Sequence, residues 1–317
     1  MKVTDHLNNS KDTLYSFEIL PPLKGQTIES IYGAIDPLME FKPPFIDVTY
    51  HREEFVYKKQ DNGLHKKQSI RKRPGTVAIC AAIMNRYNID AIPHIICGGF
   101  SKDQTEYALI DLNFLGINNI LALRGDPVAS EKSFIPEVDG HQDSCSLIDQ
   151  IKMMNDGVYL DENLENLTTS EFCIGVAGYP EKHYEAPNMK SDIEFLKKKV
   201  DAGADYIVTQ MFFDNAKFFS FVDNCRANGI DVPIIPGIKP ITVKSHLMSL
   251  PRHFFIELPE DLTNAVSACK DNKAVREVGI EWGIQQCKEL KAAGVPCIHF
   301  FTMSRHGATY KILSEVY

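Results

Sequence analysis

The sequence predicts an α/β protein of the (β/α)8 TIM barrel class, and two observations lead to that prediction. Eight short apolar runs recur along the chain, each typical of a strand buried on both faces of a parallel sheet. Segments with helical periodicity separate these runs, as the crossover helices of a closed parallel sheet require. No Pro/Gly/Ser-rich linker divides the chain, so we expect residues 1–317 to form a single domain.

The predicted elements cover most of the chain. The predicted strands span residues 15–20, 45–50, 92–97, 119–124, 172–178, 205–210, 233–238 and 297–302. The predicted helices span residues 28–40, 76–87, 102–115, 146–154, 191–202, 216–228, 274–293 and 308–316. Glycines that follow a helix and precede a strand are typical of helix ends in the left-handed conformation, and the chain has them at Gly116, Gly203, Gly229 and Gly294.

Composition and charge limit the class of protein. The hydrophobic fraction of 44% and the charged fraction of 24% are those of a soluble globular protein, without an apolar run long enough to span a membrane. The polar N-terminus does not resemble a signal peptide, so we expect a cytoplasmic protein. The eight cysteines form no CxxC pair, which favours reduced core thiols over disulfides or a structural metal.

The net charge of −8 disfavours nucleic acid as a partner. One segment, residues 65–74 (HKKQSIRKRP), is locally basic, and its composition predicts a solvated loop. We therefore expect no nucleic-acid partner. A small-molecule substrate and a homo-oligomer are further expectations.

Residues 118–126 (NNILALRGD) are the stretch around which the predicted site is organised. An apolar run ends abruptly there at Arg124, Gly125 and Asp126. The carboxyl ends of barrel strands form the active-site face, so charged residues at such an end are candidates for chemistry. The alternative is a loop in which Asp126 caps the next helix or pairs with Arg124 in solvent.

The first predicted strand contains a second candidate, Glu18, in the run SFEILPP. Period-two alternation puts Glu18 on the same face as Ser16 and Leu20, with Phe17 and Ile19 on the other face. Burial inside a barrel raises the pKa of a carboxyl by desolvation, so Glu18 could donate a proton near neutral pH. The alternative is a structural glutamate paired with an inward Lys or Arg.

Polar residues in other strands are weaker candidates. Thr49 and Tyr50 end the second predicted strand, His94 lies in the third, and Gln210 ends the sixth. A lone inward His or Gln is more often a satisfied core polar group than a ligand contact. Their expected position at one end of the barrel is what makes them candidates.

The segment after the fifth strand, residues 178–186 (GYPEKHYEA), combines rings with fixed charges, and the next helix carries Asp192 and Lys199. Such a set suits a large flat cofactor with phosphates, with Tyr179 available for stacking and Lys199 for phosphate. The alternative is a solvated loop in which Lys199 is one of three adjacent surface lysines. No GxGxxG motif follows a strand, so a dinucleotide would not be held as in a Rossmann fold.

Several of these segments occur together as blocks in a fixed order: SFEILPP, VTY, IPHIIC, LALRGD, GYPEKHYEA, KVDAGADYIVTQMFFD, IIPGI and HFFTMSR. In this order and spacing they resemble the bacterial and catalytic-domain form of the methylenetetrahydrofolate reductase family, over nearly the whole chain. The resemblance implies an FAD-containing barrel that takes hydride from NADH or NADPH. It also implies that the barrel reduces 5,10-methylenetetrahydrofolate to 5-methyltetrahydrofolate, which supplies methyl groups for methionine synthesis.

The resemblance assigns roles to single residues. Glu18 matches the general acid that protonates and opens the folate imidazolidine ring. Asp126 matches a carboxylate that tunes the flavin potential and stabilises the developing cation. Gln210, His246 and Arg305 match positions that hold the folate, with Arg305 suited to a carboxylate of the glutamyl tail. The positions that match flavin neighbours are Thr49, Tyr50, His94, Arg124, Gly125, Asp126, Asp143, Ser144, Tyr179, His183, Ala186, Asp192 and Lys199.

Some positions depart from the family pattern. Asp143 and Ser144 stand where many relatives have Tyr and Ala beside the flavin, and Phe195 stands where a polar neighbour is common. His246 aligns with a Gln, and an imidazole there predicts folate binding that depends on pH between about 6 and 8. The alternative places His246 on the outer face of its helix, away from the folate.

Two other functions compete with this one. Another flavin barrel, such as one of the proline dehydrogenase type, shares the architecture but not the SFEILPP and LALRGD blocks. A folate- or flavin-binding barrel without turnover would keep the cofactor loop but would not need an inward acid at Glu18. The sequence does not choose between NADH and NADPH.

Overall fold

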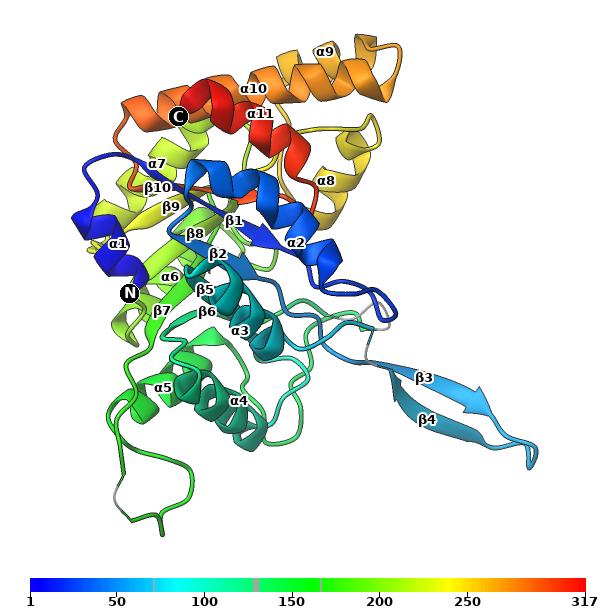
Figure 1. Ribbon diagram of the computed structural model, residues 1–317, viewed down its shortest axis with the longest axis vertical. Helices are drawn as coiled ribbons and strands as arrows, with labels where there is room; N and C mark the ends of the chain where they lie inside the picture. Colours follow the sequence, from blue (N-terminus) through cyan, green and yellow to red (C-terminus); the bar gives the residue numbers. More distant parts are fainter. Residues whose placement is uncertain (71, 128–130, 166) are drawn as a thin grey trace.

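The computed structural model describes residues 1–70, 72–127, 131–165 and 167–317. Eight parallel strands close into a barrel in the order β1-β10-β9-β8-β7-β6-β5-β2, with helices outside it (Figure 1). The barrel strands are β1 (Leu14–Ile19), β2 (Phe45–Val48), β5 (Asp90–Ile96), β6 (Asn119–Leu123), β7 (Cys173–Gly178), β8 (Tyr206–Met211), β9 (Ile234–Ile238) and β10 (Cys297–Phe301). The TIM barrel prediction is confirmed, and each predicted strand is present with its ends within two residues of the expected positions.

Most of the predicted helices are also present. They are α3 (Thr76–Tyr87), α4 (Lys102–Phe114), α5 (Ser144–Asn155), α6 (Met189–Asp201), α7 (Asn215–Ala227), α10 (Asn272–Ala292) and α11 (His306–Val316). The helix predicted at residues 28–40 is instead divided into α2 (Glu29–Ile35) and a 3-10 helix, η1 (Asp36–Phe41). Pro37 explains the division, because it has no backbone N–H with which to continue the hydrogen bonds of α2. Within the described part of the chain, no helix combines the length and the apolar character that a membrane span requires.

Glycines end several of these helices as predicted. The backbone φ angle is positive at Gly116 (70°), Gly203 (119°), Gly229 (71°) and Gly294 (74°). A residue with a Cβ atom is strained in this left-handed region, so glycine is the residue that lets the chain turn from helix to strand.

Among the described residues, three helices lie outside the predicted helical ranges: α1 (Val3–Asn9), α8 (His246–Phe254) and α9 (Glu260–Ala268). The position of α1 depends on contacts distant in sequence. Val3 N–H donates to Asn119 Oδ1 over 2.8 Å, and Asn119 Nδ2 donates to the Met1 carbonyl over 2.8 Å. Val3 and Leu7 also pack against inward residues near the start of the barrel strands, so α1 covers the amino-terminal end of the barrel.

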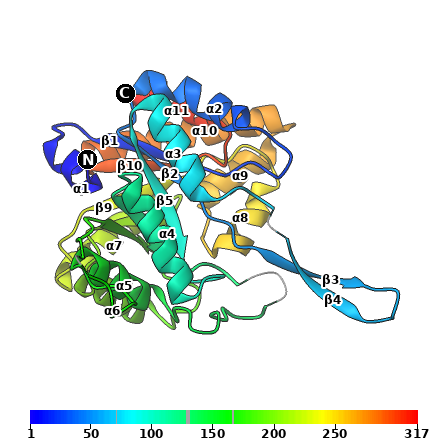
Figure 2. The same cartoon turned by 60° about the horizontal axis from the view of Figure 1, so that its bottom comes forward.

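The basic segment at residues 65–74 was expected to be a loop, and this prediction is wrong for its first part. Residues His65–Ile70 form β4, which pairs antiparallel with β3 (Glu54–Lys59). This hairpin extends away from the barrel in both views (Figures 1 and 2). Its turn contains Gly63 with φ of 79°. The Asn-Gly pair of that turn is typical of a hairpin. The hairpin was not predicted because its two strands are rich in charged residues and contain no apolar run.

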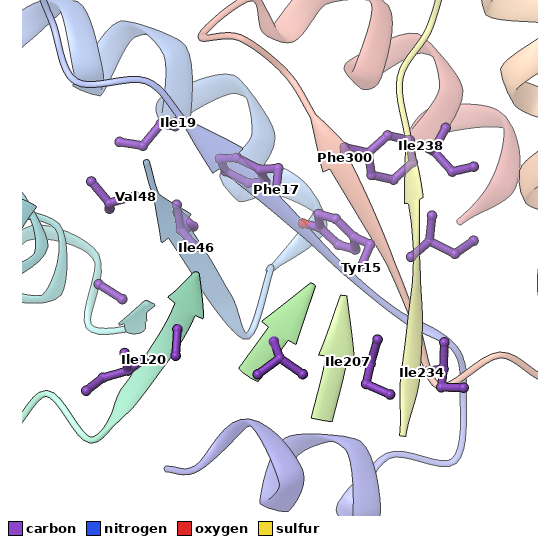
Figure 3. Packing of buried hydrophobic residues seen from close by; sticks show 14 of the residues in the cluster. Tyr15, Phe17, Ile19, Ile46, Val48, Ile120, Ile207, Ile234, Ile238 and Phe300 are labelled. Carbon is purple, nitrogen blue, oxygen red and sulfur yellow. The ribbon is translucent and has the colours of Figure 1, made fainter. Parts of the chain in front are cut away.

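The barrel strands alternate between an outward face under the helices and an inward face. Phe17, Ile19, Ile46 and Phe300 are outward residues and fully buried, and Figure 3 shows how such side chains pack together. The inward face of β1 instead carries polar groups. Strand alternation therefore separates the apolar layer that stabilises the barrel from the interior that can hold chemistry.

We expect Asn119→Ala to lower the free energy of unfolding by about 1–3 kcal/mol, the cost of leaving a buried polar group without its partner. Asn119 is 1% exposed and bonds both Val3 N–H and the Met1 carbonyl. Denaturant unfolding followed by circular dichroism measures the change. Asn228→Ala is the matched control, because its exposed amide bonds only the nearby Asn224 carbonyl of α7. Equal losses for the two variants would contradict the anchoring role of Asn119.

Candidate active site

A cavity of about 560 Å³ opens at the carboxyl ends of the barrel strands, within the size range of ligand sites in proteins. It receives side chains from β1, from β5 and β8, and from the segments that follow β2, β6, β7 and β10. The residues of the predicted site that line it are Glu18, Thr49, His94, Arg124, Gly125, Asp126, Asp143, Ser144, Tyr179, His183, Ala186, Asp192, Lys199 and Gln210. Phe195, which departs from the family pattern, lines it as well.

Three predicted site residues do not line this cavity: Tyr50, His246 and Arg305. The ring of Tyr50 lies against Phe100, with ring centroids 5.1 Å apart. Arg305 is exposed at the residue before α11. Their positions depend on how the segments after the strands fold back over the barrel, and a sequence match does not specify that.

His246 is the first residue of α8, is half-buried and does not line the cavity, so its contact with folate stays a prediction. Its Nδ1 accepts a hydrogen bond from Thr242 N–H over 3.3 Å. Burial lowers the pKa of His246 to about 4, and the positive charges of Lys239 and Arg305 act in the same direction. This pKa keeps the imidazole neutral between pH 6 and 8 and so does not favour the predicted pH dependence of folate binding, which stays a prediction.

Glu18 is a buried acid of the cavity, with 9% of its surface exposed. Burial raises the pKa of its carboxyl to about 7. The Asp47 carboxylate adds to this rise, while His94, Lys239 and the Thr49 hydroxyl oppose it. Burial outweighs these opposing effects, so Glu18 holds its proton over the lower part of the neutral range and can release it there.

The alternative for Glu18 was a structural pair with an inward Lys or Arg. Lys239 directly follows β9 and is close enough for its charge to act on Glu18. Its Nζ donates to the Phe301 carbonyl over 3.4 Å, however, and burial lowers the pKa of Lys239 to about 8. Lys239 therefore moderates the acidity of Glu18 without keeping that carboxyl ionised.

The segment Arg124–Gly125–Asp126 follows β6 as predicted, with Asp126 exposed and Arg124 paired with Glu185. Arg124 Nη1 pairs with Glu185 Oε2, which belongs to the segment after β7, at 2.5 Å. Burial raises the pKa of Asp126, an effect that Arg124 opposes and Glu185 strengthens. Gly125 has φ of 85°, and this left-handed turn directs the two charged side chains around the end of the strand.

Lys199 is buried, not one of three surface lysines. It is 6% exposed, its Nζ donates to the Ala177 carbonyl over 2.9 Å, and the Tyr179 ring centroid lies 5.9 Å away. Burial lowers the pKa of Lys199 to about 8, although the nearby Asp192 opposes that effect. An ammonium group has three donors and loses hydration when it is buried, so an anionic ligand beside Lys199 would be stabilised.

The segment after β7 is held in place next to this lysine. His183 N–H donates to Asp192 Oδ2 over 2.8 Å, so the first turn of α6 fixes the preceding loop. The rings of Tyr179 and His183 meet edge to face, with centroids 4.7 Å apart. Burial lowers the pKa of His183 to about 4, with Arg124 acting in the same direction, so the ring is neutral at pH 7. These rings offer apolar faces beside a buried cation.

Sequence patterns did not identify three polar residues of the site region as candidates: Asp47, Lys239 and His299. Asp47 and His299 lie within apolar runs, FIDV and CIHFF, where a single polar residue resembles ordinary core variation. The alternation of strand residues could have identified Asp47, because it places Asp47 on the same face as Thr49, a predicted site residue. Among the described residues, no cluster of three His, Cys, Asp or Glu side chains is suited to a metal ion.

Comparisons with known proteins agree with this geometry. The family model described as "Methylenetetrahydrofolate reductase" matches residues 2–317. Methylenetetrahydrofolate reductase 1 of Schizosaccharomyces pombe is 32% identical over 100% of this chain and 48% of its own length. The chain thus spans about half the length of that relative. The 5,10-methylenetetrahydrofolate reductase of Escherichia coli is 31% identical over 94% of this chain and 88% of its own length.

A solved structure supports the fold. It is described as an uncharacterized protein from Clostridium thermocellum that binds two copies of 5-methyl-5,6,7,8-tetrahydrofolic acid. It aligns with a TM-score of 0.56 and 15% identity, over 98% of this chain and 96% of its own. The match of the family model over nearly all residues, together with the near full-length match to the Escherichia coli protein, shows that this chain belongs to the methylenetetrahydrofolate reductase family.

Proposed function

We propose that the protein reduces 5,10-methylenetetrahydrofolate to 5-methyltetrahydrofolate in an FAD-dependent reaction that uses NADH or NADPH, and that residues 1–317 act as one catalytic unit. The observation that carries the proposal is the Glu18 carboxyl. It is buried, its pKa is about 7, and it shares one cavity with the residues that match the flavin neighbours of the family. Membership of the family supports reduction of this folate as the reaction.

Glu18 is the general acid in this proposal. The imidazolidine ring of the folate opens when one of its nitrogens receives a proton, because the departing nitrogen would otherwise carry negative charge. A carboxyl with a pKa of about 7 supplies that proton at neutral pH and recovers one from solvent afterwards. Ring opening leaves a cationic carbon that accepts hydride, and the Asp126 carboxylate at the same cavity stabilises that positive charge.

The residues of the cavity fit FAD. Lys199 and Arg124 supply positive charge for phosphate groups, and the Tyr179 ring supplies a face for stacking. The partial desolvation of Lys199, which lowers its pKa to about 8, is the observation that favours an anionic ligand there. When bound, FAD accepts hydride from the nicotinamide and passes it to the folate.

The cellular setting is also a proposal. We infer that the product supplies methyl groups for methionine synthesis and that the enzyme works in the cytoplasm. All eight cysteines are free thiols in the structure, which fits a reducing compartment.

Anaerobic half-reactions test the proposed function directly. We expect purified protein to carry a visible flavin spectrum, to lose the colour with NADH or NADPH, and to regain it with methylenetetrahydrofolate. A flavin that is reduced by the nicotinamide but not reoxidised by the folate would indicate another flavin barrel. A flavin that the nicotinamide does not reduce would indicate binding without turnover.

We expect Glu18→Gln to slow reduction of methylenetetrahydrofolate by about 10²–10⁴-fold, the usual contribution of a general acid. Reduction of the flavin by the nicotinamide should change little, because that half-reaction needs no proton from Glu18. Stopped-flow spectroscopy separates the two steps. Glu194→Gln, on the exposed face of α6, is the control and should behave as the unmodified protein. Equal losses in both half-reactions would remove Glu18 from this role.

We expect Asp126→Asn to raise the reduction potential of the bound flavin and to slow the folate half-reaction. A nearby anion disfavours the addition of electrons to the ring and stabilises the cation that accepts hydride, and the variant loses both effects. Potentiometric titration measures the first effect without any substrate. An unchanged potential together with normal folate turnover would leave Asp126 with only a structural part.

A further inference from the structure

Two carboxyl side chains lie next to each other on neighbouring strands inside the barrel. The parallel register pairs Glu18 of β1 with Asp47 of β2. Strand alternation turns both inward, since Ile46 and Val48 on either side of Asp47 pack in the outward apolar layer. Asp47 is 1% exposed and Glu18 9%. The two groups therefore share a poorly hydrated space in which two negative charges repel strongly.

Asp47 lies between two imidazole rings. His94 Nε2 is 3.7 Å from one carboxylate oxygen, and His299 Nδ1 is 3.8 Å from the other. Neither oxygen of Asp47 has a hydrogen-bond partner among the described residues. The Ser16 hydroxyl lies 2.9 Å from His299 Nδ1, which fixes that ring from β1. Asp47 is thus enclosed between two imidazole rings, and it makes no direct hydrogen bond within the described part of the chain.

When two carboxyl groups share such a space, one keeps the negative charge and the other takes the proton. Glu18 has the raised pKa, about 7, for which burial is the main cause and the charge of Asp47 a further one. The pair is therefore asymmetric, with the proton on the residue that lines the cavity.

Other groups also act on this pair. The charges that face Glu18 come from Asp47 on β2, His94 on β5 and Lys239 after β9, and Asp47 is the anion among them. His94 and Lys239 favour ionised Glu18, and the effect of His94 on the Glu18 pKa is larger than that of Asp47. The titratable groups that face Asp47 are His94, His299, Cys80, Tyr206 and Cys297.

We propose that Asp47 is a positioning residue that acts through Glu18: its negative charge, placed between His94 and His299, keeps the neighbouring carboxyl protonated until the substrate takes the proton. The proton that leaves Glu18 goes to a substrate nitrogen and is replaced from solvent through the cavity. This assignment rests on the proposed function for the role of Glu18 as general acid. Which of the two carboxyl groups carries the negative charge and which carries the proton does not depend on the substrate.

The protonation state of Glu18 can be measured without any folate. Infrared difference spectroscopy against Glu18→Gln identifies the C=O band of the protonated Glu18 carboxyl, which is then titrated in the full-length protein between pH 5 and 9. We expect the band to disappear with a midpoint near the pKa of about 7. In Asp47→Asn the midpoint should fall by about one to two pH units, the size expected for loss of a neighbouring charge in a protein interior.

Two further variants keep the test decisive. Tyr206→Phe removes a buried hydroxyl that faces Asp47 but changes no charge, and its midpoint should match the unmodified protein. Asp47→Ser removes the charge with a smaller side chain, and it replaces Asp47→Asn if that variant does not fold. An unchanged midpoint in a folded Asp47 variant, or an equal change in Tyr206→Phe, would overturn the proposal.

The pH dependence of the folate half-reaction is a second measurement of the same effect. A general acid works in its protonated form, so activity should be lost as pH rises through the pKa of Glu18, and the loss should begin at lower pH in Asp47→Asn. At pH 7.5 the variant should be about ten-fold slower for each pH unit by which its midpoint falls, with a smaller difference at pH 5.5. If methylenetetrahydrofolate does not react with the unmodified protein, the proposed function fails, while the infrared midpoints still decide the role of Asp47. Coincident pH profiles with different infrared midpoints would separate Asp47 from catalysis and contradict its proposed role.

Discussion

The desolvation of one carboxyl, that of Glu18, is the constraint on which the site depends. A carboxyl with little access to water is costly to ionise, so it keeps a proton at a pH where an exposed glutamate would have lost it. The barrel creates this condition because strand alternation puts Glu18 on the inward face while Phe17 and Ile19 pack outward. Closure of the sheet then removes the interior from bulk solvent. The chemistry thus follows from the same alternation that builds the core.

The electrostatic surroundings divide the cavity into two regions. Near the strand ends, Glu18 and Asp47 face two histidines and a lysine, a set suited to holding and releasing a proton. Toward the segments after β6 and β7, Arg124 and Lys199 stand among rings, a set suited to an anionic, flat ligand. A reaction that moves a proton to one group and hydride between others requires these two regions to be adjacent but electrostatically distinct.

The fold could be predicted largely because parallel barrel strands are buried on both faces and therefore read as apolar runs. The elements that escaped prediction lack that signal. Helix α1 is short, and its place depends on Asn119, which is more than a hundred residues away in sequence. The β3-β4 hairpin is charged on both strands, and α8 contains Pro251 in its interior, which lowers its intrinsic helix propensity. For α1, tertiary contacts decide what local sequence does not.

The candidate site was predictable where residues directly follow a strand, as Arg124 and Asp126 do, because the end of a strand has one location in a barrel. Asp47 and His299 escaped because an isolated polar residue within an apolar run gives no sign of its partners on other strands. Tyr50 and Arg305 were expected from the family pattern and do not line the cavity. Their placement depends on loop conformations, which vary more between relatives than strand positions do.

The pairing of β1 with β10 has a consequence for biosynthesis. Leu14 pairs with Cys297, so the first strand of the barrel lacks this neighbour until the last strand has been translated. At about 5–20 residues per second, that delay is roughly 15–60 s, during which one edge of β1 is unpaired. An unpaired strand edge is prone to association with other chains. Nascent chains of this protein are therefore most in need of chaperones before β10 emerges, and the interior carboxyl pair reaches its finished environment only after β10 has closed the barrel.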